Sequence, residues 1–325
     1  MSSEWECVVV GGGAAGLSAA LVLGRARRRT VVIDEGEPSN SAAQTIGGLL
    51  GQDQRRPAEL YATGRRELSA YSTVAFRTGS VVNGTSRDDG ILLELDDGEK
   101  IFTRRVLLAT GMRYSPPNIA GLEELWGKSV FQCPFCHGWE MRDKRLAVLA
   151  NGDAAVHSAL MLRGWSHDVV LLTDGAPDLD ARAWRRLETA GVAVDERRIT
   201  ELIGSDGELT AIAFADGSRL ERDGLLVEAP LSQRSQLAEQ LGATYTQGPL
   251  APDSVSVDSL KRTVVSTVFA AGDVCTEHPH LAGAIAAGSE AAMIVVQSLL
   301  ADQFDLPYPP GADEHSDSEK VDSSV

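Results

Sequence analysis

The sequence predicts an α/β fold with two Rossmann-like domains, the second inserted in the first. Residues 6–34 have the pattern strand, glycine-rich turn, helix and strand, and residues 145–175 repeat that pattern. After the repeat, residues 268–274 (VFAAGDV) form a further apolar strand, followed by a helix rich in Gly and Ala. Because this last segment suits the first domain but follows the second, the second domain is expected to interrupt the first.

We expect the first domain to comprise residues 1–115 and 244–310, with residues 116–243 as the inserted domain. A chain of 325 residues is long enough for two domains with well-filled cores. The last residues, 311–325, are polar and poor in apolar side chains, so we expect a disordered tail there.

The chain is strongly acidic, with a formal net charge of −16 and a pI near 4.8. Nucleic acids and anionic membranes require a basic face, so neither is expected as the main partner. Glu4 and Glu6 stand where a secretory signal needs basic residues, which predicts a cytoplasmic protein. Residues 281–300 are long and mostly apolar, but Glu290 interrupts them, and a buried helix is expected rather than a membrane span.

The first glycine-rich turn has the spacing G-x-G-x-x-G of a dinucleotide-binding site. Gly11 permits the tight turn, Gly13 lets the backbone approach a pyrophosphate, and Gly16 lets the helix pack close to the strand. The following strand ends in Asp34, which is placed to accept hydrogen bonds from a ribose. The residues expected to hold the dinucleotide here are Gly11, Gly13, Ala14, Ala15, Gly16 and Asp34.

Two further segments indicate which dinucleotide binds. Residues 106–111 (VLLATG) and 268–274 resemble the other two flavin-binding signatures of the pyridine nucleotide–disulfide oxidoreductases. The resemblance implies FAD as the cofactor, with Asp273 on its ribityl chain. It adds Thr110, Gly111, Gly272 and Asp273 to the expected cofactor-binding residues.

A close pair of cysteines stands in the segment FQCPFCHGWE, as Cys133 and Cys136. A structural zinc site commonly needs two such pairs, so no metal is expected, and a structural disulfide over so short a loop would stabilise little. A redox disulfide is therefore favoured. Pro134 suits the first position of a helix, whose N-terminus favours thiolates. His137 can accept or deliver a proton near neutral pH. The other two cysteines, Cys7 and Cys275, are interpreted as buried small residues.

Over about residues 5–300 the chain resembles the low-molecular-weight thioredoxin reductase family. That family has Asp after the second Cys, where this chain has His137. The form CPFCHGWE, together with EPSN at residues 37–40, resembles a distinct branch, the FAD-dependent dithiol oxidases of disulfide natural products such as gliotoxin, holomycin and romidepsin. The resemblance implies a relay between Asn40 and His137, and a homodimer.

The inserted domain departs from a working NADPH site. The family pattern G-x-G-x-x-A begins here with Ala150. Residues 173–181 contain no Lys or Arg that would bind a 2′-phosphate, and they contain three carboxylates, Asp174, Asp178 and Asp180. We therefore expect NADPH recognition to be lost. Asp174 could still serve an NADH ribose, so NADH is not excluded.

Without a nicotinamide donor, electrons should enter from thiols. The resemblance implies that the enzyme closes a disulfide in a small-molecule dithiol, such as a holomycin-type antibiotic, and that molecular oxygen reoxidises the flavin to give hydrogen peroxide. It places Cys136 next to the flavin and Cys133 outermost, in a role of antibiotic biosynthesis or self-resistance. Phe135 and Trp139 are either pocket residues, core or dimer contacts. An NAD(P)H-dependent thioredoxin-disulfide reductase and a non-enzymatic redox sensor remain alternatives.

Overall fold

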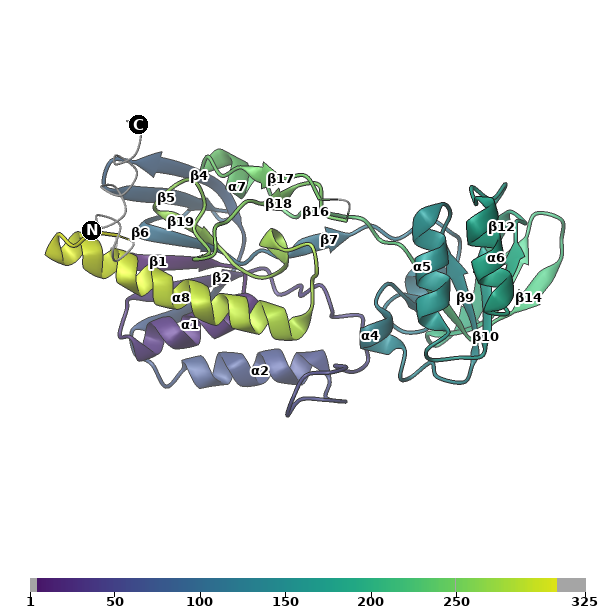
Figure 1. The fold of residues 1–325 in the computed structure, drawn as a ribbon. Coiled ribbons are helices and arrows are strands. Elements are labelled where there is room, and N and C mark those ends of the chain that lie inside the picture. The colour runs from purple at the N-terminus through teal and green to yellow at the C-terminus, as the bar shows by residue number, and fades with distance from the viewer. Residues whose placement is uncertain (1–4, 249, 309–325) are drawn as a thin grey trace, which may run out of the picture. The chain divides into compact units, whose positions relative to one another are not determined.

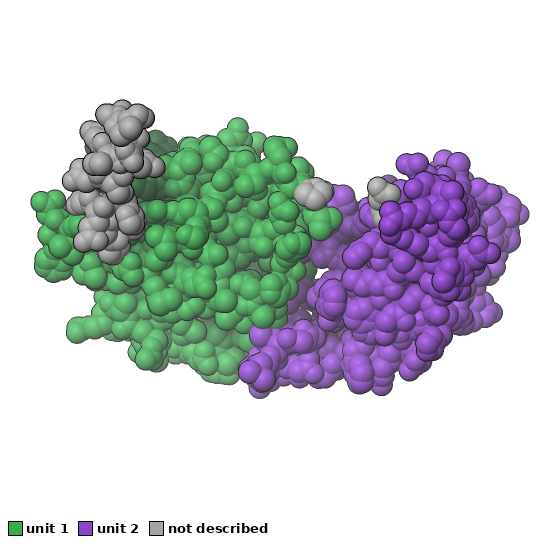
Figure 2. Space-filling view, viewed as in Figure 1, with its two compact units in different colours: residues 1–39, 59–113, 231–325 green, residues 40–58, 114–230 purple. Residues whose placement is uncertain are grey.

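The computed structural model describes residues 5–248 and 250–308. The predicted tail, 311–325, lies outside these residues. The chain forms two compact units (Figure 2). Unit 1 comprises residues 1–39, 59–113 and 231–325, and unit 2 comprises residues 40–58 and 114–230.

Unit 1 is built on a seven-stranded sheet in the order β3-β2-β1-β6-β5-β4, with β19 also paired to β6. Strands β1, β2, β3, β6 and β19 run parallel, whereas β4 and β5 form an antiparallel extension. The bounds are β1 Trp5–Val10, β2 Thr30–Asp34, β3 Val74–Thr78, β4 Val81–Arg87, β5 Gly90–Leu95, β6 Lys100–Leu108 and β19 Val268–Ala270. The strands of the first Rossmann unit are continuous apolar runs because both faces are covered.

Helices α1 (Ala14–Arg25), α2 (Pro57–Leu68) and α8 (Leu281–Phe304) lie on one face of this sheet (Figure 1). The backbones of α1 and α8 approach closely, because a Cβ on Gly288 would lie 2.0 Å from the carbonyl oxygen of Ala15. Among the described helices, α8 alone is long and apolar enough to span a membrane by length and composition. Its packing against α1 agrees with the buried helix that the sequence predicts.

Other elements of unit 1 pack on the other face, namely α7 (Leu237–Gln240), β17 (Tyr245–Thr246), β18 (Ser254–Val255) and the 3₁₀ helix η1 (Asp273–Cys275). Strands β7 (Met112–Tyr114) and β16 (Leu231–Gln233) form a separate two-stranded sheet. Residues 231–243, assigned from the sequence to the inserted domain, belong to this unit. The reason is that Leu237 and Leu241 are buried against β4, where a Cβ on Gly84 would lie 2.6 Å from Leu237.

Unit 2 contains the second Rossmann-like sheet, with parallel strands in the order β11-β10-β9-β15-β8, and a three-stranded antiparallel sheet β12-β13-β14. The strand bounds are β8 Val130–Phe131, β9 Arg145–Leu149, β10 Asp168–Leu172, β11 Ala193–Asp195, β12 Ile199–Ser205, β13 Glu208–Phe214, β14 Arg219–Glu221 and β15 Gly224–Val227. The helices are α3 (Leu122–Leu125), α4 (Pro134–His137), α5 (Asp153–Leu162) and α6 (Ala181–Thr189). This arrangement confirms the predicted fold class.

Residues 40–58 also belong to unit 2, although the sequence-based boundaries place them in the first domain. Close contacts with the cysteine motif account for this. A Cβ on Gly47 would lie 2.6 Å from the carbonyl oxygen of Cys136, and the amide of Gln54 donates to Glu140 at 2.8 Å. The segment therefore packs as a wall of the disulfide site.

Candidate active site: a disulfide in unit 2 and a dinucleotide cradle in unit 1

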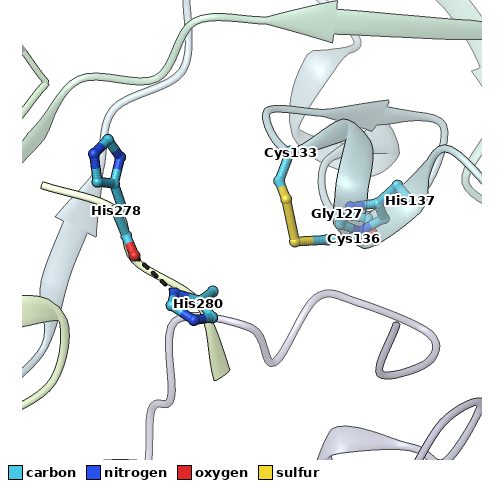
Figure 3. Close-up of a disulfide and its surroundings, with 6 residues drawn as sticks. All are labelled: Gly127, Cys133, Cys136, His137, His278 and His280. Atoms are coloured by element: carbon cyan, nitrogen blue, oxygen red, sulfur yellow. Dashed lines mark hydrogen bonds between the residues drawn. A yellow bond between two sulfur atoms is a disulfide. The ribbon is translucent and has the colours of Figure 1, made fainter. Parts of the chain in front are cut away.

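The two close cysteines form a disulfide at the start of α4 (Figure 3). Cys133 is the N-cap in extended conformation and Pro134 occupies the first turn, as the sequence predicts. The backbone N–H groups of Cys136 and His137 donate to the carbonyl of Cys133, at 3.1 and 3.2 Å. The helix ends after four residues, so its dipole acts only over a short range.

His137 is the last residue of the disulfide helix and is half-buried. Its Nε2 lies 3.2 Å from the carbonyl oxygen of Gly127, a residue drawn beside it in Figure 3. Its ring stacks on Phe131 with centroids 5.5 Å apart. Its Nδ1 is buried and has no hydrogen-bond partner among the described residues, so neither sulfur is bonded to it. Burial lowers the pKa of the imidazole, against smaller opposing effects of the Cys133 and Gly127 carbonyls. The ring is therefore neutral at neutral pH.

Asn40 lies in the same unit as His137, at the start of the wall segment 40–58. Its carbonyl accepts a hydrogen bond from the N–H of Ala43 at 3.1 Å, which closes a turn. That turn lies against Gly127, since a Cβ there would be 2.9 Å from the Cβ of Ala42. The turn thus reaches His137 through Gly127, and a direct relay between Asn40 and His137 stays a prediction.

Phe135 lies within the disulfide helix and Trp139 follows it, and the two side chains are 74% and 63% exposed. The interpretation of these two side chains as core is therefore wrong, which leaves a substrate pocket or a contact with a partner chain. Phe135 meets Trp165 edge to face at 5.5 Å, and the guanidinium of Arg142 lies over the Trp139 ring at 4.2 Å. Each ring is therefore held by one neighbouring side chain and is otherwise exposed to solvent.

The glycine-rich turn of unit 1 fits the phosphates of a dinucleotide. Gly11 has φ +105°, and a Cβ there would lie 2.2 Å from the carbonyl oxygen of Ala109. Gly13, before the first turn of α1, faces open space, because a Cβ there would meet no atom within 4 Å. The N–H of Gly12 donates to Asp34 Oδ1 at 2.9 Å, which holds this carboxylate beside the turn.

The other predicted cofactor residues gather around the same turn. Thr110 lines a pocket with Gly11 and Asp34, and Gly272, at φ +84°, brings the end of β19 next to Ala15 of α1. Asp273 follows at the start of η1. Arg234 also lines this pocket and was not predicted from the sequence; it donates to the Glu37 carbonyl at 2.6 Å. No motif marks Arg234, because it reaches this pocket from a distant part of the chain.

The second Rossmann turn is closed by one of its own side chains. Asn151 Oδ1 accepts from the N–H groups of Gly152 and Asp178, at 2.9 and 2.7 Å. Its Nδ2 donates to the carbonyls of Ala176 and Thr173, at 3.0 and 3.4 Å. The carboxamide therefore ties the β9–α5 turn to the loop after β10. Asn151 was not among the predicted residues, although it stands between Ala150 and Gly152 in the altered motif.

The loop after β10 differs in part from its sequence-based description. Asp180 caps α6 by accepting from the N–H of Ala183, and Asp174 accepts from the N–H of Ile199, so these carboxylates have structural partners. A cationic side chain, Arg198, nevertheless lies beside this loop. Arg198 lies 3.7 Å from Asp174 and lines Gly175. Because Arg198 lies outside residues 173–181, the charge pattern of that segment does not reveal it.

The two lone cysteines, Cys7 and Cys275, are protonated thiols of low reactivity. Burial raises the pKa of Cys7 and that of Cys275 to about 12, so neither thiol ionises near neutral pH. Within residues 5–248 and 250–308, no group of three or more His, Cys, Asp or Glu side chains could hold a metal ion.

The family model described as pyridine nucleotide-disulphide oxidoreductase matches residues 5–291. The chain belongs to this family. As a member, it is an FAD-binding flavoenzyme that acts as a thiol/disulfide oxidoreductase, which removes the alternative of a non-enzymatic sensor. Its thioredoxin reductase-like character rests on relatives as well as on the family model.

Among its relatives is a protein named thioredoxin reductase tcpT from Claviceps purpurea (strain 20.1). The two are 33% identical over 307 residues, which is 91% of this chain and 95% of the relative. Two solved structures are also similar. An oxidoreductase from Agrobacterium tumefaciens is 34% identical with a TM-score of 0.86, covering 91% of this chain and 99% of that one. The structure titled HlmI is 35% identical with a TM-score of 0.86, covering 93% and 95%. The resemblance to thioredoxin reductase-like enzymes is thus confirmed.

Proposed function

We propose that the chain is an FAD-dependent dithiol oxidase, which closes an intramolecular disulfide in a small-molecule dithiol and releases hydrogen peroxide from molecular oxygen. The single observation that carries this proposal is the closure of the second Rossmann turn by Asn151. Its carboxamide takes the backbone N–H of Gly152 at the start of α5, where a nucleotide phosphate would bind, and ties this turn to the N–H of Asp178 in the loop after β10. This contact disfavours a nicotinamide donor and so supports the Cys133–Cys136 disulfide as the entry for electrons.

The chemistry divides between the cysteines and His137. A substrate thiolate attacks Cys133, the sulfur–sulfur bond breaks, and Cys136 leaves as a thiolate. The second substrate thiol then attacks the mixed disulfide, which forms the product disulfide and frees Cys133. His137, neutral before the reaction, accepts a released proton. Bound FAD, held by the turn at Gly11, supplies a two-electron acceptor that oxygen can reoxidise.

For each disulfide formed, two electrons and two protons leave the dithiol, and one oxygen molecule becomes one hydrogen peroxide. The substrate we propose is a small dithiol such as a reduced holomycin-type antibiotic, in a context of antibiotic biosynthesis or self-resistance. Phe135 and Trp139, open on one side, offer apolar contacts to such a molecule. We also propose a cytoplasmic homodimer.

The test is anaerobic stopped-flow reduction of the flavin by NADPH, NADH and a panel of small dithiols. We expect dithiols to bleach the flavin, and air to restore its colour with one peroxide per disulfide. Cys133→Ser serves as the control that retains FAD but does not respond to dithiols. Faster bleaching by micromolar NADPH than by any dithiol would refute the proposal.

One observation favours a second candidate, an NAD(P)H-dependent thioredoxin-disulfide reductase-like enzyme. Arg198 lies beside the loop where such enzymes bind the nucleotide, and it is 72% exposed. Its charge is opposed by Asp174 at 3.7 Å, which weakens its attraction for a phosphate. The comparison of NADPH with dithiols separates the two candidates directly.

A further inference from the structure

The two ring nitrogens of His137 have different surroundings, and this difference assigns their roles. We infer that the backbone carbonyl of Gly127 fixes the Nε2–H tautomer of His137 and so leaves Nδ1 as the proton-accepting atom. The catalytic consequence rests on the proposed dithiol oxidation, whereas the tautomer itself does not. Gly127 is then a positioning residue.

The tautomer follows from the hydrogen-bond chemistry of a carbonyl, which accepts but never donates. The carbonyl oxygen of Gly127 lies 3.2 Å from Nε2, so this nitrogen carries the hydrogen. In the neutral ring, Nδ1 must then hold the lone pair, and it is the buried atom without a hydrogen-bond partner. Stacking on Phe131, which is 1% exposed, fixes the plane of the ring.

The direction of the Gly127 carbonyl is fixed from two sides. Its own N–H donates to the carbonyl of Val130 at 2.8 Å, which ties it to β8. On the other side, a Cβ at Gly127 would lie 2.9 Å from the Cβ of Ala42 and 3.2 Å from the nitrogen of Ala43. Its φ of +73° is also a conformation that side-chain-bearing residues rarely adopt. Only glycine fits here without moving the carbonyl.

Proton transfer to Nδ1 then completes the environment of the ring. When a thiol gives its proton to Nδ1 and becomes a thiolate, the resulting imidazolium has N–H groups on both nitrogens. The carbonyls of Gly127 and Cys133 both favour this charged form. The negative charge of Glu140, whose carboxylate is bound by Gln54, favours it as well. These three effects offset part of the cost of burial, which still keeps the pKa of His137 below its ordinary value.

The first test needs no variant. Long-range ¹H–¹⁵N spectra of the oxidised, FAD-loaded protein with labelled histidine report the tautomer of each ring. His137→Gln identifies the signals that belong to residue 137. We expect a protonated Nε2 and an unprotonated Nδ1 above the pKa of the ring. The reverse pattern would overturn the inference even if dithiol turnover is normal, and absent turnover with the expected pattern would overturn only the proposed function.

The second test moves the carbonyl. Gly127→Ala should give mixed tautomers and lower dithiol turnover about tenfold, equivalent to about 1.4 kcal/mol, with an altered pH profile and normal FAD content. Ala42→Gly in the same chain removes the closest contact and should recover part of the loss. Gly217→Ala is the matched control, since Gly217 has φ +82° in the β13–β14 turn with no atom within 4 Å of a Cβ. Pure Nε2–H tautomer and unchanged turnover in Gly127→Ala would refute the positioning role.

Discussion

Replacing Asn151 by Ala should loosen the second Rossmann turn without affecting FAD binding. Three of the hydrogen bonds of the carboxamide are 2.7–3.0 Å long, and the fourth, to Thr173, is 3.4 Å. A hydrogen bond contributes about 0.5–1.5 kcal/mol net, and water can replace the partners here because the turn is exposed. We therefore expect a loss of about 2 kcal/mol in the local free energy of opening.

The assay is native-state hydrogen exchange at the amides of Gly152 and Asp178, which Asn151 holds. A loss of about 2 kcal/mol corresponds to roughly 30-fold faster exchange at both amides if the turn opens locally. Asn83→Ala, on an exposed position of β4, is the matched control and should leave both amides unchanged. Equal exchange rates in wild type and Asn151→Ala would refute the view that this side chain closes the turn.

Further predictions concern the reaction centre and the cofactor. Cys133→Ser and Cys136→Ser should each abolish peroxide release with dithiols and leave the protein yellow, as absorbance and an oxygen-electrode assay will show. His137→Ala should slow thiol-dependent flavin reduction roughly 10²–10⁴-fold in stopped flow; an unchanged rate would remove His137 from the mechanism. Because burial lowers its pKa below 6.5, His137 should be available as a proton acceptor above that pH, and turnover should fall as the pH drops through the lowered value, while ionisation of the substrate thiol shapes the profile at higher pH. The free energy of unfolding should also fall as the pH drops below 6.5, because His137 binds a proton at a higher pH in the unfolded state than in the folded state. Asp34→Ala should weaken FAD binding, measured by flavin retained on dialysis; full retention would contradict the role of this carboxylate.

The features predicted well from the sequence are those determined by neighbours in the chain. The turn at Gly11 needs only a strand, a glycine and the helix that follows, so the spacing of the motif specifies it. Pro134 at the start of α4 is likewise a local signal. In both cases the structure has a helix that begins where the sequence predicts it, α1 after the glycine-rich turn and α4 at Pro134.

The features that were missed depend on contacts between distant segments. Gly127 meets His137 across ten residues and Ala42 across 85, so no spacing rule marks it. Arg198 reaches Asp174 from the position just before β12, outside the segment 173–181 from which the absence of cations was inferred. The wall segment 40–58 lies within the first domain by order along the chain, yet it packs with the cysteine motif. Such contacts are set by tertiary packing rather than by local propensity.

The second Rossmann sheet has a use that does not depend on a nicotinamide cofactor. Strand β8 pairs with β15 at the edge of this sheet, with Phe131 opposite Leu226. Two residues later the chain reaches Cys133, and Phe131 supports the ring of His137 from below the disulfide helix. The sheet therefore positions both the sulfur atoms and the proposed proton acceptor. Asn151 can close the nucleotide turn at the end of β9 without disturbing β8, because the two sites lie on different strands of the same sheet. The scaffold for thiol chemistry and the proposed loss of nucleotide access are thus compatible within one domain.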